Sequence, residues 1–272
     1  MEPPHPPLPT FLIIGAQKSA TRWLRVNLGE HPDIFTAPEE VAYFNKRNRI
    51  RRWGLEWYRD QFVGWAGEPV IGEATPGYMM WRHDPNFVAK RIKRDLPDVR
   101  LIAILRNPID RAQSALRHHV RRGRLPAKTK LVKVVKKKRN RKIEQLGLIN
   151  GGLYWASLRP YVKRFDDRLL VLLHDEVGRN PRGVYTRALQ HVGALPTFVP
   201  PNLTAIVFSN RGQNSPVDEL TLDERCEMWE YFEDDVRRLQ RLLGRNLQLW
   251  NPNRQRMARA ARPTPVTDQA AS

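Results

Sequence analysis

The most informative absences in this chain of 272 residues concern cysteine and long apolar runs. A single cysteine, Cys226, excludes an intrachain disulfide and any metal site built from several cysteines. No apolar run approaches the roughly 20 residues that a membrane-spanning helix requires. The first ten residues, MEPPHPPLPT, contain neither the basic start nor the apolar stretch of a secretory signal peptide. We therefore expect a cytoplasmic protein.

Acidic residues are also scarce, and the basic ones are unevenly distributed. The chain contains 47 Lys and Arg against 28 Asp and Glu, which gives a formal charge of +19. Residues 117–142 alone hold 13 Lys and Arg and no acid, so the rest of the chain carries only +6. This basic segment indicates either a local anionic partner or a solvated insertion. Leu131, Val134 and Val135 share one face at helical spacing, so part of the segment is expected to form an amphipathic helix.

Four short apolar runs alternate with stretches of helical pattern. The runs cover residues 10–14, 69–72, 100–105 and 168–173, and the expected helices cover 19–28, 84–95, 108–121, 153–165 and 182–192. Strands that are apolar throughout are typical of a parallel sheet covered on both faces. We therefore predict a three-layer α/β fold with a central parallel sheet flanked by helices.

The ends of the chain have a different composition. A capping box at Thr221 and Glu224 predicts the start of a last helix, which Gly244 is expected to end. Residues from Asn251 onward have little to bury. The predicted organisation is one domain at residues 10–250 between flexible ends at 1–9 and 251–272.

The stretch GAQKSATRWL, residues 15–24, follows the first apolar run and has the features of an anion-binding loop. Gly15, then Lys18, then a helix starting near Thr21 would present backbone N–H groups and a lysine to a phosphate. The pattern G-x-x-x-x-G-K-[ST] of loops that bind nucleoside triphosphates is missing. Taken alone, the loop is equally compatible with an ordinary strand-to-helix turn.

A second polar stretch, RNPIDRAQSALRHH at residues 106–119, follows the apolar run at 100–105. Triphosphate-hydrolysing enzymes place an acid here to hold Mg²⁺, whereas this chain has Arg106. An arginine at a strand end, with Ser114 on the next helix, favours bidentate binding of an anion. Because ligands bind at the carboxyl ends of parallel strands, the two stretches together indicate a nucleotide with two separate phosphate groups.

The two stretches resemble the cofactor motifs of PAPS-dependent sulfotransferases, whose donor is 3′-phosphoadenosine 5′-phosphosulfate (PAPS). GAQKSATRWL resembles the 5′-phosphosulfate loop G-x-x-K-S-G-T-x-x-L, and LRNPIDRAQSAL resembles the 3′-phosphate motif. Three further segments, HPDIFTAPEEVAYFN at 31–45, GLEWYRDQF at 54–62 and GLYWASLRPYVKRF at 152–165, resemble the heparan-sulfate branch of that family. The likeness covers residues 10–250 and implies a P-loop-like fold.

The resemblance also implies roles for single residues. Glu40 corresponds to the catalytic base, and Lys18 to the residue that stabilises charge on the leaving nucleotide, 3′-phosphoadenosine 5′-phosphate (PAP). The implied cofactor contacts are Gly15, Gln17, Lys18, Ser19, Ala20, Thr21, Arg22, Trp23, Arg106, Ser114, Arg211 and Gly212. No metal is implied. Ala20 departs from the usual glycine of the loop, and Ala74 stands where that branch often has a lysine.

Glu73, Tyr78 and His118 are the predicted acceptor-binding residues. The expected acceptor is a carbohydrate or glycolipid that offers a hydroxyl or an amine. An anionic glycan or glycolipid headgroup is the favoured partner of the basic segment 117–142, ahead of nucleic acid or an anionic membrane.

Several interpretations stay open at this point. Glu39, His118 or His119 is an alternative base to Glu40, and Glu73 is alternatively a helix cap. Trp23 either stacks on adenine or packs in the core, and the aromatic residues Trp53, Trp57 and Tyr58 form either a sugar-stacking wall or part of the core.

Two other functions compete with sulfuryl transfer. One is a P-loop nucleotide or nucleoside kinase, against which the missing G-K-[ST] and the presence of Arg106 both argue. The other is a basic nucleic-acid-binding protein on the same fold, which the charge of +19 favours and the cofactor motifs do not.

Overall fold

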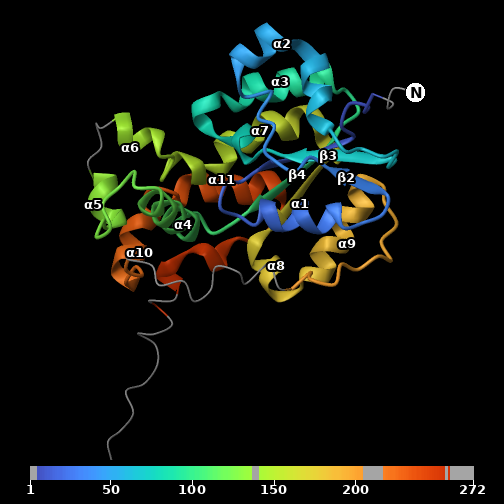
Figure 1. Cartoon of the computed structure of the whole chain (residues 1–272). Helices are drawn as coiled ribbons and strands as arrows, with labels where there is room; N and C mark the ends of the chain where they lie inside the picture. The colour runs from blue at the N-terminus through green and yellow to red at the C-terminus, as the bar shows by residue number, and fades with distance from the viewer. Residues whose placement is uncertain (1–4, 137–140, 205–216, 255–256, 258–272) are drawn as a thin grey trace, which may run out of the picture.

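A computed structural model of the protein describes residues 5–136, 141–204, 217–254 and 257. Its centre is a five-stranded, all-parallel sheet with the strand order β2-β3-β1-β4-β5 (Figure 1). The strands are β1 (Phe11–Gly15), β2 (Ile34–Thr36), β3 (Val70–Ala74), β4 (Arg100–Leu105) and β5 (Leu169–Leu173). The four predicted apolar runs are thus confirmed as strands, whereas β2 is too short to stand out in the sequence.

Five helices of the structure follow from local sequence signals. The predicted helices are confirmed as α1 (Thr21–Gly29), α3 (Pro85–Asp95), α4 (Pro108–Arg121), α7 (Tyr154–Phe165) and α9 (Pro181–Val192). The Asp84 carboxylate accepts the backbone N–H groups of Asn86 and Phe87 and so caps α3. The described residues also form helices without a clear sequence signal: α2 (Arg47–Arg59), α6 (Arg141–Gln145) and α8 (His174–Arg179).

The prediction of one continuous helix after Thr221 is wrong. Thr221 and Glu224 do form the capping box, but the chain makes two helices, α10 (Leu222–Trp229) and α11 (Glu233–Leu243). The turn between them brings Phe232 into the core, where its side chain is completely buried. Gly244 ends α11 in a left-handed conformation with φ of 59°.

Successive strand residues pack into two cores, one on each face of the sheet, because side chains alternate along a strand. Leu12 and Ile14 of β1 belong to the core that contains residues of α3, α4, α7 and α11. Phe11 and Ile13 belong to the other core, with residues of α1 and α9. Figure 1 shows the two groups of helices on opposite sides of the sheet. The predicted three-layer arrangement is confirmed.

The basic segment contributes to one of these cores. Residues Leu131–Lys136 form α5, in which Leu131, Val134 and Val135 are buried while Lys133 is exposed. The predicted amphipathic helix is therefore confirmed, and a purely solvated insertion does not describe this part of the segment. The neighbouring residues 137–140 lie outside the described residues, as does most of the predicted tail at 251–272. Within the described part of the chain, every helix is too short or too polar to cross a membrane.

Candidate functional site

The site lies where β1, β3 and β4 end, at one edge of the sheet. The loop after β1 contains two residues in the left-handed backbone region, Lys18 with φ of 71° and Ala20 with φ of 70°. Ala20 is the N-cap of α1, so Thr21 opens the helix and its N-terminus faces this edge. Gly15 is required because a side chain there would lie 2.7 Å from the Met79 sulfur. The helix dipole and free N–H groups favour an anion at this point.

Arginine side chains surround the lysine of this loop. Arg106, directly after β4, donates a hydrogen bond of 3.2 Å from its guanidinium to the Lys18 backbone carbonyl. Partial burial lowers the pKa of Lys18, and the charges of Arg121, Arg106 and Arg111 lower it further. Because like charges repel, an anion that bound between these side chains would stabilise the arrangement. The structure thus brings together the predicted residues Lys18 and Arg106 from motifs 88 positions apart.

Two buried hydroxyl groups lie beside these cations without hydrogen-bond partners of normal geometry among the described residues. They belong to Ser19, which is completely buried, and to Tyr154 at the start of α7, which is 1% exposed. Burial raises the pKa of the Tyr154 hydroxyl, whereas the charge of Arg111, the Arg106 backbone and the Ser19 hydroxyl lower it, so the Tyr154 hydroxyl lies close to all three. A buried hydroxyl without a partner is costly, so both groups are suited to bind a ligand.

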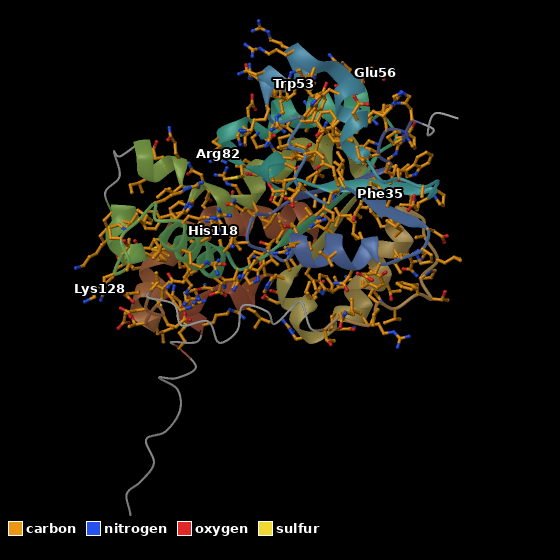
Figure 2. All side chains as sticks on the ribbon, in the orientation of Figure 1. Phe35, Trp53, Glu56, Arg82, His118 and Lys128 are labelled. Carbon is orange, nitrogen blue, oxygen red and sulfur yellow. The ribbon has the colours of Figure 1, made fainter. Side chains whose placement is uncertain are left out.

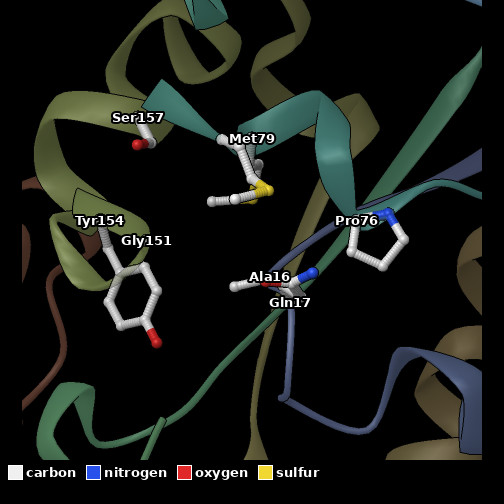
Figure 3. Close-up of a pocket in the computed structure, with 8 residues that line it drawn as sticks. Ala16, Gln17, Pro76, Met79, Gly151, Tyr154 and Ser157 are labelled. Carbon is white, nitrogen blue, oxygen red and sulfur yellow. The ribbon is translucent and has the colours of Figure 1, made fainter. Parts of the chain in front are cut away.

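Tyr154 is a residue that the sequence analysis missed. It lies in the segment GLYWASL, which the resemblance covers without assigning a role to its tyrosine. In Figure 3 the Tyr154 ring projects from α7 toward a small pocket whose other side is formed by Ala16 and Gln17 of the loop. Met79, from the short helix η2 (Pro76–Met79) after β3, closes the pocket. The pocket is therefore bounded by elements that follow β1 and β3 together with α7.

Glu40 lies on the exposed loop that follows β2. Although the residue is exposed, the protein around its carboxyl group raises the pKa, and the charge of Glu39 raises it further. Arg25 of α1 acts in the opposite direction. Glu40 is thus held near the helix that follows the anion-binding loop, with a proton affinity above that of an ordinary glutamate.

Glu73 and Tyr78, two of the predicted acceptor-binding residues, are completely buried. The Tyr78 hydroxyl donates a hydrogen bond of 2.5 Å to Glu73 Oε1. Buried side chains that are hydrogen-bonded to each other do not reach an acceptor molecule at the surface. Their placement therefore does not support the predicted contact with the acceptor molecule. The third predicted residue, His118, is partly buried on α4. Burial and then the charge of Lys18 lower its pKa to about 4, so the ring is neutral at pH 7.

The remaining predicted cofactor residues occupy different environments. Trp23 is 2% exposed in the core between α1 and the sheet, and its indole N–H donates to the Leu203 carbonyl at 2.8 Å. This favours the packing interpretation over adenine stacking. Ser114 is partly buried and Arg22 is exposed. Arg211 and Gly212 lie outside the described residues.

The aromatic residues of α2 divide between core and surface. Tyr58 is completely buried, whereas Trp53 is 45% exposed. The Arg49 guanidinium lies over the rings of Trp53 and Trp57, at 5.7 and 5.3 Å from their centres. Figure 2 labels Trp53 beside α2. Only part of this group is therefore available to a ligand.

Comparison with known proteins gives a family match over most of the chain. The protein-family model described as the sulfotransferase domain matches residues 8–234 of this chain. The heparan sulfate glucosamine 3-O-sulfotransferase 3B1 of Mus musculus is 30% identical over 195 residues, which are 68% of this chain and 46% of that protein. The membrane-associated sulfotransferase kil1 of Dictyostelium discoideum is 37% identical over 111 residues, 39% of this chain and 22% of that protein. The matched regions thus span less than half the length of these relatives.

A solved structure shares the whole architecture. The crystal structure of a sulfotransferase from Alicyclobacillus acidocaldarius superposes with a TM-score of 0.75 at 28% sequence identity. The match covers 90% of this chain and 99% of that chain. This chain therefore shares the fold of that solved structure over most of its length.

Proposed function

Because the chain belongs to the sulfotransferase domain family, we propose that it transfers a sulfuryl group from PAPS to a hydroxyl or amine of an acceptor. The observation that carries this proposal is the gathering of Lys18, Arg106 and the unpartnered Ser19 hydroxyl at the ends of β1 and β4. A partly buried site with cations and hydroxyl donors is suited to bind the two phosphate groups of PAPS.

The residues present fit a nucleotide with two anionic ends. Ser19 and Thr21, at the N-terminus of α1, would hold the 5′-phosphate by hydrogen bonds and by the helix dipole. Arg106 and Ser114 would hold the 3′-phosphate, and Tyr154 would donate its buried hydroxyl to the same ligand. When bound, PAPS supplies the sulfuryl group and departs as PAP.

Two residues would carry the chemistry on the protein side. The Lys18 ammonium offers positive charge to the oxygen that gains negative charge during transfer. Glu40 would take the acceptor proton on its carboxylate, and its raised pKa strengthens it as a base. General base catalysis of this kind typically contributes a factor of about 10²–10⁴. The alternative His118 is a weaker base, because burial and then the charge of Lys18 lower its pKa to about 4. Burial also lowers the pKa of His119.

We further propose a carbohydrate acceptor, possessing either a free hydroxyl or an amine. The support is the name of the Mus musculus relative, which acts on heparan sulfate glucosamine. The exposed cations Arg121, Arg122 and Arg124 follow His118 in the basic segment and would attract an anionic glycan or glycolipid headgroup. His118 would contact that acceptor as a neutral hydrogen-bonding group.

The experiment that tests the cofactor is calorimetric titration with PAP and, separately, with ATP and Mg²⁺. We expect the wild type to bind PAP and not ATP, and Arg106→Ala to weaken PAP binding roughly 10- to 150-fold, the value of a charge-assisted hydrogen bond. Arg100→Ala is the matched control, because Arg100 is exposed at the opposite end of the same strand. A preference for ATP would contradict the proposal and favour a kinase.

A further inference from the structure

The carboxylate of Glu73 is completely buried at the end of β3, yet it is fully supplied with hydrogen-bond donors. Tyr58 and Tyr78 donate their hydroxyl groups to Oε1, at 3.1 and 2.5 Å. Thr75 donates its hydroxyl group to Oε2 at 2.5 Å, and the backbone of Val41 lies near enough to lower the pKa of the same carboxylate. These donors favour the ionised carboxylate, against burial, which has the larger effect and raises the Glu73 pKa.

The donors to Glu73 are themselves bonded to the loop that carries Glu40. The Ala42 backbone N–H donates to Thr75 Oγ1 at 3.0 Å, and the Tyr43 backbone N–H donates to the Tyr78 hydroxyl oxygen at 3.2 Å. The Val41 backbone lies near the Glu73 carboxylate as well, so three consecutive amides face this cluster. These amides follow Glu40 directly in the chain.

The loop amides fix the direction of two bonds in this cluster. A backbone N–H group can only donate, so the hydroxyl oxygens of Thr75 and Tyr78 accept from the loop. Each hydroxyl keeps its own proton, which it donates to the Glu73 carboxylate.

The loop that carries Glu40 is also held by hydrogen bonds at its start, at Ala37. The Ala37 backbone N–H donates to the Gly72 carbonyl at 2.9 Å, and the Arg25 guanidinium donates to the Ala37 carbonyl at 3.0 Å. Only residues 38–40 lie between these contacts and the three amides that face the Glu73 cluster. So short a segment leaves Glu40 little freedom.

We propose that Glu73, acting through Thr75 and Tyr78, is a positioning residue that sets the place of the Glu40 carboxylate. The proposal rests on the proposed function in so far as Glu40 is the base. It replaces a direct contact between Glu73 and the acceptor. It also explains why a buried acid occurs on β3, a strand whose other side chains are apolar or absent.

Amide hydrogen exchange of the free protein tests the anchoring without any substrate. Tyr78→Phe removes the acceptor of the Tyr43 amide, and Thr75→Val removes the acceptor of the Ala42 amide. We expect the exchange of the affected amide to become about tenfold faster in each variant. Tyr58→Phe is the matched control, because Tyr58 donates to Glu73 Oε1 but is not the acceptor of the Ala42 or Tyr43 amide.

A second readout reports on Glu40 itself. Burial and Glu39 raise the Glu40 pKa, whereas Arg25 lowers it, so carbon-13 NMR titration of this carboxyl group senses its position. In Tyr78→Phe we expect the titration midpoint of Glu40 to move toward the ordinary pKa of a glutamate. In Tyr58→Phe we expect this midpoint to stay unchanged. PAP affinity, measured by calorimetry, should be unchanged in both variants, because neither tyrosine is among the residues proposed to bind PAPS.

The outcomes separate the two proposals. Equal exchange at the Ala42 and Tyr43 amides in all variants, or equal acceleration by Tyr58→Phe, would overturn the positioning role. An unchanged Glu40 midpoint in Tyr78→Phe would also overturn it, because the cluster would then only stabilise the fold. Failure of the wild type to bind PAP would contradict the proposed function and would leave the exchange result valid.

Discussion

Two polar clusters lie at the same edge of the sheet and differ in how completely their groups are paired. After β3, the buried Glu73 carboxylate receives bonds from Tyr58, Thr75 and Tyr78. After β1, the buried Ser19 hydroxyl has no hydrogen bond of normal geometry to the described residues. Because burying an unpaired polar group is costly, the first cluster contributes to the architecture and the second is prepared for a ligand.

The charges of the two clusters differ in the same way. Hydrogen bonds from Thr75, Tyr78 and Tyr58 lower the Glu73 pKa, against the larger effect of burial, which raises it. The charged neighbours that lower the Lys18 pKa are all arginines: Arg121, Arg106 and Arg111. Arg111 is completely buried and donates to the carbonyls of Gly147 and Leu148 rather than to an acid. An anion would relieve this repulsion, whereas a second cation would increase it.

The largest effect that this comparison predicts is a loss of stability on truncation of Glu73. Glu73→Ala leaves three hydroxyl donors and one backbone N–H without their acceptor, so we expect the free energy of unfolding to fall by about 3–5 kcal/mol. Urea denaturation measures it. Glu40→Ala is the matched control, because it truncates the same residue type at an exposed position and is expected to change stability by less than about 0.5 kcal/mol.

This pair of variants tests whether Glu73 and Glu40 contribute differently to stability. If Glu40→Ala destabilised the protein as much as Glu73→Ala, the two glutamates would share a structural role. If Glu73→Ala left the free energy of unfolding unchanged, then water or a neighbouring group would replace the carboxylate as acceptor, and the cluster would not be part of the architecture.

The fold was largely predictable because its signals are local. The runs at 10–14 and 100–105 are apolar throughout, and Asp84 before Pro85 has the composition of a helix start. The short strand β2 gave no such signal, because its three residues pair with β3 only after the chain has folded. The break at Phe232 was equally hidden, since it depends on burial in a distant core.

The site was predictable where function depends on motif spacing, and less so where it depends on orientation. The stretches around Lys18 and Arg106 were located by their positions after apolar runs. The sequence placed Glu73 at a strand end, but its contacts depend on the loop after β2, which the sequence did not reveal. Tyr154 was passed over because a tyrosine at the start of a helix is ordinarily a packing residue.

A smaller effect is expected in the unpaired cluster. Ser19→Ala removes a hydroxyl that has no hydrogen bond of normal geometry to the described residues. We therefore expect the free energy of unfolding to change by less than about 0.5 kcal/mol. The affinity for PAP should fall about tenfold, because one hydrogen bond to the phosphate is lost. Chemical denaturation and calorimetry measure the two quantities on the same protein.

The opposite behaviour is expected of a paired hydroxyl. Thr10 donates from Oγ1 to the Ile71 carbonyl at 3.2 Å, at the amino end of β1 and away from the site. Thr10→Val should therefore lower stability by about 1 kcal/mol and leave PAP affinity unchanged. A loss of stability in Ser19→Ala without a loss of affinity would show that the two clusters do not differ as described.

The smallest effect concerns the backbone of the unpaired cluster. Ala20 adopts φ of 70° at the N-cap of α1, a conformation that costs an alanine roughly 1 kcal/mol relative to glycine. Ala20→Gly should stabilise the protein by up to about 1 kcal/mol in urea denaturation. Ala156→Gly, within α7, should destabilise it by about the same amount, because glycine weakens a regular helix. If both variants were destabilising, the left-handed turn would not be strained. If Ala20→Gly is stabilising and PAP affinity stays the same, the strain belongs to this chain's departure from the usual glycine and not to ligand binding.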